Sequence, residues 1–346
     1  MIFFTFLGVG KVSDKGEIKG YYDVVYNLCS VNYSTPYVQV AILKHHQEID
    51  TLVVFLTRKA YEYHHEFLEA YLVQENIKVN IHYEYIDLDV KYEELIRIMI
   101  NYLKSDSNYI IDITHSFRII PFKLFTTLDY INVVTNAKLQ HIYYGNLENK
   151  RIEDFIEDVV NSKIATALEI FNKTLKVDMD LFKGVSFIDK QLYKFLENCE
   201  KLNQVIELAD FDHSISIVNT IVSECKRFKK DSRYAYFVEF LDAILMKFEN
   251  FNISNKTEAK VIVIKALLKS DYYQLAITFT DQLFREELIK ATLGNEFYLQ
   301  DVKEDMVYDI SQLLLSESYY GLKKYSQKKQ SALEAAEKVI LKNKRL

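Results

Sequence analysis

Five polar or charged residues that can cap a helix or bind a phosphate or ribose lie within seven positions of one another near the middle of the chain. They are Asp112, Thr114, His115, Ser116 and Arg118. Together they offer a carboxylate, two hydroxyls, an imidazole and a guanidinium, a set suited to holding a phosphate or a ribose. A second interpretation is that Asp112 and Thr114 only cap a helix and that Arg118 pairs with a surface carboxylate.

The stretches on either side of this group indicate how it is positioned. Tyr109–Ile113 has the apolar, β-branched composition of a buried strand, and Phe122–Ile131 is apolar-rich like a helix. In open parallel sheets, ligands bind beyond the carboxyl ends of strands, where the next helix presents unpaired N–H groups and the positive end of its dipole. We therefore expect the ligand at this strand-to-helix turn.

The first predicted strand, residues 2–7, also ends in residues suited to a phosphate. Four of them follow in sequence, Gly8, Val9, Gly10 and Lys11. The glycines allow a sharp turn and a close approach of backbone to ligand, and the lysine supplies a cation. Residues 13–36 are polar and Tyr-rich, which indicates an excursion or hairpin before the first helix at 38–46.

Two later strands repeat this arrangement. The strand at 52–56 ends at Thr57 and Arg58, which either line the ligand or begin a solvated helix. The strand at 140–146 contains Tyr143, Tyr144 and Gly145. Either tyrosine can pack in the core or stack on an adenine, a contact that contributes about 1–3 kcal/mol per base.

Strands and helices alternate through residues 1–155, which predicts a Rossmann-like, doubly wound, mostly parallel α/β sheet. Residues 156–346 predict an all-helical second domain. Its expected helices are 164–175, 189–210, 214–228, 233–250, 258–270, 272–293, 303–315 and 321–342. In the first domain, His64 and His65 point about 100° apart on the helix at 60–74, so we expect them at the surface and not around one metal ion.

The order Asp112-Ile113-Thr114-His115-Ser116-Phe117-Arg118 resembles the signature of the CRISPR-associated DxTHG-motif proteins. Ser116 stands where that family usually has glycine. The opening Phe6-Leu7-Gly8-Val9-Gly10 and the Ile142-Tyr143-Tyr144-Gly145 strand extend the resemblance across residues 1–155. It implies a CARF domain (CRISPR-associated Rossmann fold) that binds a cyclic oligoadenylate, with cyclic tetra-adenylate expected, across the two-fold axis of a homodimer.

The resemblance also implies a set of ligand contacts. They are Gly8, Val9, Gly10, Lys11, Thr57, Arg58, Asp112, Thr114, His115, Ser116, Phe117, Arg118, Tyr144 and Gly145. No separate cofactor and no metal are expected, and Asp87 and Asp89 lack a third metal ligand.

Asp271–Phe279 resembles a helix of HEPN ribonuclease domains, which often form the helical half in this family. HEPN chemistry uses an Arg and a His separated by a gap of four to six residues. Here His213 is the only histidine after residue 155, and the arginines Arg227, Arg233, Arg285 and Arg345 all follow it. The catalytic motif is therefore missing, and His213, beside Asp210 and Asp212, is expected to belong to a helix cap.

Three function classes follow from these observations. The first is a type III CRISPR sensor that binds the ring and signals to its helical domain. The second is an atypical HEPN-like ribonuclease acting on single-stranded RNA. The third is a ring nuclease that cleaves its own ligand, with Ser116, Arg118 and Lys11 orienting and stabilising the reacting phosphate. An unrelated nucleotide-binding Rossmann protein is the remaining alternative.

Composition limits the partners. The net charge of −6 argues against duplex DNA, because wrapping a duplex needs a basic surface. Cys29, Cys199 and Cys225 form neither a disulfide framework nor a CxxC metal knuckle. No stretch reaches the ~18 apolar residues of a membrane span, and the apolar start lacks the basic residues of a signal peptide. We expect a cytoplasmic protein.

Overall fold

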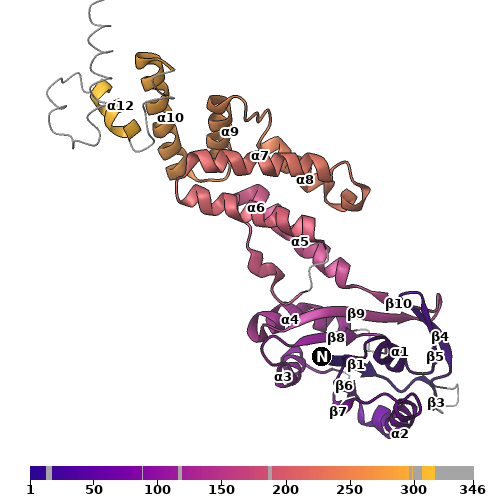
Figure 1. The fold of residues 1–346 in the computed structure, drawn as a ribbon. Coiled ribbons are helices and arrows are strands. Elements are labelled where there is room, and N and C mark those ends of the chain that lie inside the picture. Colours follow the sequence, from indigo (N-terminus) through magenta and orange to yellow (C-terminus); the bar gives the residue numbers. More distant parts are fainter. Residues whose placement is uncertain are drawn as a thin grey trace, which may run out of the picture. The chain divides into compact units, whose positions relative to one another are not determined.

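The computed structural model describes residues 1–12, 18–87, 89–115, 119–185, 189–295, 298 and 306–315. These residues form two compact units. The first comprises Met1–Ile164 and Met179–Lys190, and the second comprises Ala165–Asp178 and Gln191–Leu346. Figure 1 shows the strands in the indigo-to-magenta part of the ribbon and only helices from orange to yellow.

An eight-stranded sheet organises the first unit, in the order β5-β4-β10-β9-β8-β1-β6-β7. Five neighbouring strands, from β9 to β7, are parallel. The strands of the sheet are β1 (Ile2–Leu7), β4 (Val24–Leu28), β5 (Val31–Thr35), β6 (Thr51–Leu56), β7 (Asn80–Tyr85), β8 (Asn108–Asp112), β9 (Lys138–Asn146) and β10 (Arg151–Asp154). The predicted α/β sheet is therefore confirmed, and the stretch before the first helix contains the antiparallel β4–β5 hairpin.

The parallel strands reverse their spatial order between β1 and β8. From β1 the chain moves to β6 and then β7 on one side, whereas β8 and β9 lie on the other side. This is the topological switch point of a doubly wound sheet, where the loops after the two central strands separate and leave room for a ligand. The two loops that follow β1 and β8 are the ones that carry the glycines and the polar group singled out in the sequence.

Helices cover both faces of this sheet (Figure 1). Those of the first unit are α1 (Val38–His45), α2 (Arg58–Gln74), α3 (Tyr92–Tyr102) and α4 (Ile119–Thr135). Side chains of α1 and α2 join Phe3, Leu7 and Val54 in one buried core. On the opposite face, Phe4 contacts the ring of Tyr102 from α3. Strand side chains alternate between the two faces, so each face is filled by every second residue.

A two-stranded ribbon, β2 (Lys11–Val12) and β3 (Ile18–Gly20), lies outside the main sheet. After β10 the chain enters α5 (Ile156–Thr174), which passes from the first unit into the second. The chain then returns to the first unit with the 3-10 helix η1 (Met179–Phe182) before α6 begins. The chain thus crosses between the units three times.

The second unit is helical in all its described elements, as the sequence predicts. They are α6 (Lys190–Glu207, which begins in the first unit), α7 (Phe211–Phe228), the 3-10 helix η2 (Ser232–Phe237), α8 (Val238–Lys247), α9 (Lys256–Lys269), α10 (Tyr273–Leu293) and α12 (Val307–Leu315). The single helix expected at 233–250 is wrong at its start. Tyr234 leaves the helical region with φ −104° and ψ 15°, so α8 begins only at Val238. The helix expected at 321–342 lies outside the described residues.

Candidate functional site

The site is built at the carboxyl edge of the sheet. The register of the parallel strands places Thr5 opposite Asp112, and Asp112 opposite Tyr143. Gly8 follows β1, Thr57 follows β6, and the polar group begins at the end of β8. The described residues of all four predicted segments therefore come from the same edge, around the switch point.

Asp112 forms the buried centre of this edge, with no exposed surface. The Thr5 hydroxyl donates a hydrogen bond to its Oδ2 at 2.6 Å, and the Thr114 backbone N–H donates to its Oδ1 at 2.9 Å. The Thr114 hydroxyl also donates to Oδ1. Asp112 is thus occupied inside the protein, where it holds the start of the turn instead of facing solvent.

Burial raises the pKa of the Asp112 carboxyl from 3.8 to about 6, because the charged form loses hydration. The hydrogen bonds from Thr114 and Thr5 oppose this shift because they stabilise the carboxylate. No cation is among the causes of the shift. The carboxylate is therefore held by neutral donors alone.

Gln39 completes this network from α1, and sequence reasoning missed it. Its Nε2 donates to Thr5 Oγ1 at 2.9 Å and to the Phe6 carbonyl at 3.3 Å, and lies 3.4 Å from Asp112 Oδ2. Thr5 was missed as well. The available signals were a single glutamine in the apolar stretch Val38–Leu43 and a single hydroxyl within an apolar strand.

Thr114 links the turn to the end of β9. Its hydroxyl accepts a hydrogen bond from the Gly145 backbone N–H at 2.7 Å while donating to Asp112. A Cβ added at Gly145 would lie 3.0 Å from Val38 Cγ2 and 3.1 Å from Thr114 Cγ2. Position 145 therefore favours glycine for reasons of space.

The glycine loop after β1 lies against the same turn. A Cβ at Gly8 would lie 3.3 Å from the His115 carbonyl oxygen, and the Gly8 carbonyl accepts a hydrogen bond from the Tyr21 hydroxyl at 3.0 Å. Gly10 has a φ of +76°, in the region that favours glycine. The ring of Tyr21 lies 4.3 Å from that of His115, between centroids. The first loop and the polar turn are thus one packed structure.

His115 is partly exposed as a residue, but its Nε2 atom is buried and has no hydrogen-bond partner among the described residues. Burial lowers the pKa of its imidazole to about 4, and the nearby His64 lowers it further by charge repulsion. His115 is therefore neutral at neutral pH. A neutral imidazole can donate or accept one hydrogen bond at Nε2, depending on its tautomer.

His64 corrects the sequence analysis, which placed it at the surface. It is 2% exposed and lies on the buried stripe of α2 with Ala60, Leu68 and Leu72. The four residues are spaced by four, so the helical period that buries the leucines also buries the histidine. Its Nδ1 contacts the Tyr37 hydroxyl at 3.1 Å, and burial lowers its pKa.

The residues after β6 serve the helix that follows. Thr57 is the N-cap of α2 and accepts a hydrogen bond from the Ala60 N–H at 3.3 Å. Arg58 is exposed, and its guanidinium carbon lies 5.9 Å from the centroid of the Tyr85 ring. Both residues remain at the carboxyl edge, and Arg58 has no carboxylate partner within the described part of the chain.

Other predicted site residues fall partly or wholly outside the described structure. Ser116, Phe117 and Arg118 lie outside the described residues. Lys11 has a described backbone, paired with Gly20, whereas its side chain is not described. Their roles stay predictions.

The two tyrosines of β9 have different environments. Tyr143 is 1% exposed, and its hydroxyl lies 2.7 Å from His46 Nε2, so it is a core residue. Tyr144 is 38% exposed and lies beside the ring of Phe155. Tyr144 is therefore the tyrosine of this pair that remains available for stacking.

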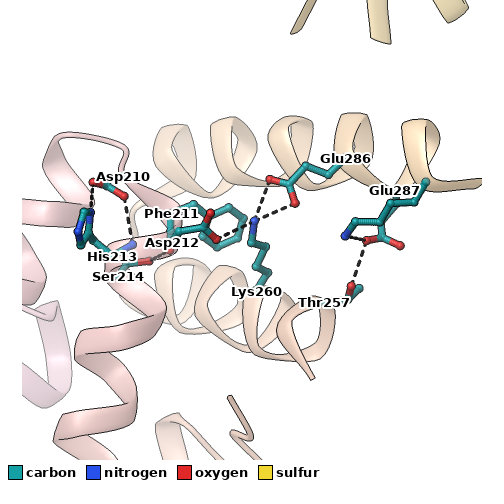
Figure 2. A network of polar contacts seen from close by, with 10 residues as sticks. Asp210, Phe211, Asp212, His213, Ser214, Thr257, Lys260, Glu286 and Glu287 are labelled. Carbon is teal, nitrogen blue, oxygen red and sulfur yellow. Dashed lines mark hydrogen bonds and ion pairs between the residues drawn. The ribbon is translucent and has the colours of Figure 1, made fainter. Parts of the chain in front are cut away.

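In the second unit, His213 belongs to a helix cap, as the sequence indicated. Asp210 caps α7 by accepting a hydrogen bond from the His213 N–H at 3.1 Å, and its other carboxylate oxygen lies 2.5 Å from the His213 ring. Figure 2 shows both contacts. This pairing orients the imidazole at the start of a helix.

A cluster of three charged side chains joins three helices near this cap (Figure 2). Lys260 of α9 donates to both carboxylate oxygens of Glu286 of α10 at 2.8 Å and lies 3.1 Å from Asp212 of α7. The Lys260 and Glu286 side chains are 5% and 4% exposed. They line part of a cavity of about 890 Å³. The ammonium is fully engaged by carboxylates, so this cluster links the helices.

None of the helices in the described part of the chain combines the length and apolar character that a bilayer crossing requires. Within the same residues, no group of three or more His, Cys, Asp or Glu side chains is arranged to hold a metal ion.

Comparison with known proteins gives one informative similarity. No family model matches the chain. The chain is similar to CRISPR-associated protein MJ1674 of Methanocaldococcus jannaschii, with 24% identity over 241 residues. The match covers 65% of this chain and 36% of that protein, so the chain spans only about a third of the relative's length.

Proposed function

We propose that this chain is a type III CRISPR accessory protein that binds a cyclic oligoadenylate at the carboxyl edge of its sheet and signals to its helical unit. The similarity to a protein named as CRISPR-associated supports the setting of this proposal. The ligand and the site rest on the sequence motif and on the chemistry of the edge.

The contact between Thr114 and Gly145 is the observation that carries the proposal. It joins the turn after β8 to the end of β9, while Gly8 brings the loop after β1 against His115. These contacts bring the ends of β1, β8 and β9 together at a switch point of a doubly wound sheet, where nucleotide ligands bind. Because Gly145 is buried and its N–H is bonded to Thr114, a phosphate would meet the loops after β1 and β8.

The positive charges that a ring of phosphodiesters requires would come from the same edge. Asp112 is buried and hydrogen-bonded within the protein, so its carboxylate does not face the ligand. His115 is neutral, so it adds no charge of its own to the site. Lys11 and Arg118 would supply the positive charge, and Ser116 a hydroxyl, from the loops that flank the switch point.

We further propose that the ring lies across a homodimer axis and that cyclic tetra-adenylate is the preferred ring. Rings of four or six identical nucleotides contain a two-fold axis, which matches a site built twice by a dimer axis, whereas a ring of three does not. The preference for four follows from the family resemblance. Each protomer then contacts one half of the ring through the same residues.

The helical unit acts in this proposal as the output of the sensor. Because no arginine precedes His213 in this unit and its imidazole belongs to a helix cap, HEPN-type RNA cleavage has no support from its side chains. A ribonuclease role would need a different constellation.

Titration of the purified chain with cyclic tri-, tetra- and hexa-adenylate tests the proposal. Calorimetry measures binding, and chromatography of the same samples measures the fate of the ring. The proposal predicts binding, tightest for the tetra-adenylate, with the ring intact. A linear product would make the protein a ring nuclease, and the absence of binding to any ring would refute the assignment.

A further inference from the structure

A short segment between the helices of the second unit belongs structurally to the first unit. We call Met179–Val185 the strap. Its flanking residues, up to Asp178 and from Gln191, belong to the helical unit. The strap consists of η1, a turn at Lys183–Gly184, and Val185, which forms an isolated parallel bridge with Leu139 of β9. It therefore extends the sheet beside the first residues of β9.

Gly184 packs so closely against Asn132 and Ala137 that no side chain fits there. We call this packed position of Gly184 the seat. Its φ is +81°, and a Cβ built there would lie 2.4 Å from the Asn132 Cβ and 2.8 Å from the Ala137 carbonyl oxygen. Such distances are far below van der Waals contact, so glycine alone fits this seat. The Gly184 carbonyl accepts a hydrogen bond from the Leu139 N–H at 2.7 Å. Phe182 and Val185 are 6% and 7% exposed.

Asn132 connects this seat to the candidate site. It lies on α4, which begins at Ile119, directly after the polar turn. Its Oδ1 accepts a hydrogen bond from the hydroxyl of Tyr109, which is on the same strand as Asp112. Asn132 thus contacts both the strand that ends in the site and the strap that precedes the helical unit.

The seat also contains an unsatisfied polar group. Asn132 is 2% exposed, and its Nδ2 has no hydrogen-bond partner among the described residues. A buried amide without an acceptor is unfavourable, and it regains hydrogen bonds when water reaches it. The seated strap is therefore held by a tight fit that a small movement of α4 would disrupt.

We propose that the contact between Asn132 and Gly184 is a latch that opens when the candidate site is occupied. The inference rests on the proposed function, because occupancy of the site is what drives it. A ligand that binds at Asp112–His115 acts on α4 through β8, whose Tyr109 hydroxyl donates to Asn132, and shifts the helix. The helix cannot slide past Gly184 without separating from it. The strap is released, and α6, which begins five residues after Val185, gains freedom.

Amide hydrogen exchange of the full wild-type chain tests the latch. Leu139 reports on it directly, because its N–H donates to the Gly184 carbonyl. With cyclic tetra-adenylate at a concentration that calorimetry shows to be saturating, exchange at Leu139 should become at least about fivefold faster. Unchanged or slower exchange at saturation would overturn the latch and leave the proposed function intact. No binding heat with any ring would overturn both.

Two glycine variants provide a matched comparison. Gly184→Ala places a methyl group in the occupied seat, whereas Gly294→Ala places one at a φ of +94° with no atom within 4 Å. Both carry the strain of a positive φ, and only the first carries the clash. By linkage, Gly184→Ala should bind cyclic tetra-adenylate about fivefold or more tightly than wild type, with fast Leu139 exchange even without ligand. Gly294→Ala should match wild type.

Equal ring affinity in wild type and a folded Gly184→Ala would overturn the latch. If Gly184→Ala fails to fold, the exchange measurement on wild type decides the question by itself.

Discussion

The hydroxyl of Thr114 accepts a hydrogen bond from the backbone N–H of Gly145, 31 residues later in the chain, at 2.7 Å. The same hydroxyl donates to the buried carboxylate of Asp112. One side chain therefore fixes the start of the turn after β8 to the end of β9. The arrangement of these two segments at the carboxyl edge depends on it.

Thr114→Val keeps the shape of the side chain and removes both hydrogen bonds. We expect the free energy of unfolding to fall by about 1–3 kcal/mol, because a buried carboxylate and a backbone N–H each lose a partner. Chemical denaturation measures this loss. Thr126→Val is the matched control, because the Thr126 hydroxyl bonds only the Lys123 carbonyl on the exposed face of α4. A loss equal to that of the control would contradict the proposed role.

Gly145→Ala tests the space at the end of β9. The added Cβ meets Val38 and Thr114 at 3.0–3.2 Å, so we expect a loss of about 1–3 kcal/mol from overpacking. Val38→Ala removes the nearest contact but also leaves a cavity, because Val38 is fully buried. Thermal melts of both single variants and the double variant give the comparison: the loss in the double variant should be smaller than the sum of the single losses, and additive losses would show that Val38 is not the obstacle.

The pKa of Asp112 predicts an effect of pH on stability. The folded pKa of about 6 lies above the ordinary 3.8, so the native state binds more protons between these values. The contribution of Asp112 to the free energy of unfolding is thus fully present below about pH 4. It is lost as the pH rises to 6, which lowers the free energy of unfolding by roughly 3 kcal/mol. Asp112→Asn removes this slope, and denaturation at pH 4 and pH 7 measures the difference from wild type.

His115 makes the free energy of unfolding depend on pH in the opposite direction over the same range. Its folded pKa of about 4 lies below the ordinary 6.5, so its contribution is present above pH 6.5 and is lost as the pH falls towards 4. The two slopes oppose each other in wild type. His115→Gln should therefore expose the Asp112 slope, and a variant that responds to pH just as wild type does would contradict this assignment.

The stability of the helical unit should depend strongly on both partners of its buried ion pair, Lys260 and Glu286. Lys260→Met leaves the buried Glu286 carboxylate without its cation and should destabilise the unit by about 3–5 kcal/mol. The double variant with Glu286→Leu should recover most of this loss, because no charge then remains buried there. Lys173→Met is the control, because Lys173 and Glu169 are exposed and their pair contributes at most about 1 kcal/mol.

The sequence predicted the sheet because each strand is short, apolar and followed by a polar turn. It also placed Gly8, Thr57 and Thr114 at one edge, since parallel strands share their carboxyl ends. It did not predict that Thr5 and Asp112 face each other, because strand register depends on pairing between distant segments. Gln39 was missed for the same reason, since α1 meets β8 only in the folded sheet.

His64 shows a different limit. Its position beside His65 suggests a surface residue, whereas the spacing of Ala60, His64 and Leu68 places it on the buried stripe of α2. The strap had no local signal either. Gly184 is one glycine in a stretch of mixed apolar and charged residues, and its role depends on Asn132, which lies 52 residues earlier.

The most direct test of the central claim compares ring binding by wild type with two arginine variants. Arg118 is the arginine of the sequence motif that begins at Asp112, and Arg97 is an exposed arginine of α3 outside that motif. Calorimetric titration with cyclic tetra-adenylate should give tight binding to wild type and to Arg97→Ala, and at least about a tenfold weaker affinity for Arg118→Ala. Equal affinity for all three proteins, or no binding to wild type, would contradict the proposed site.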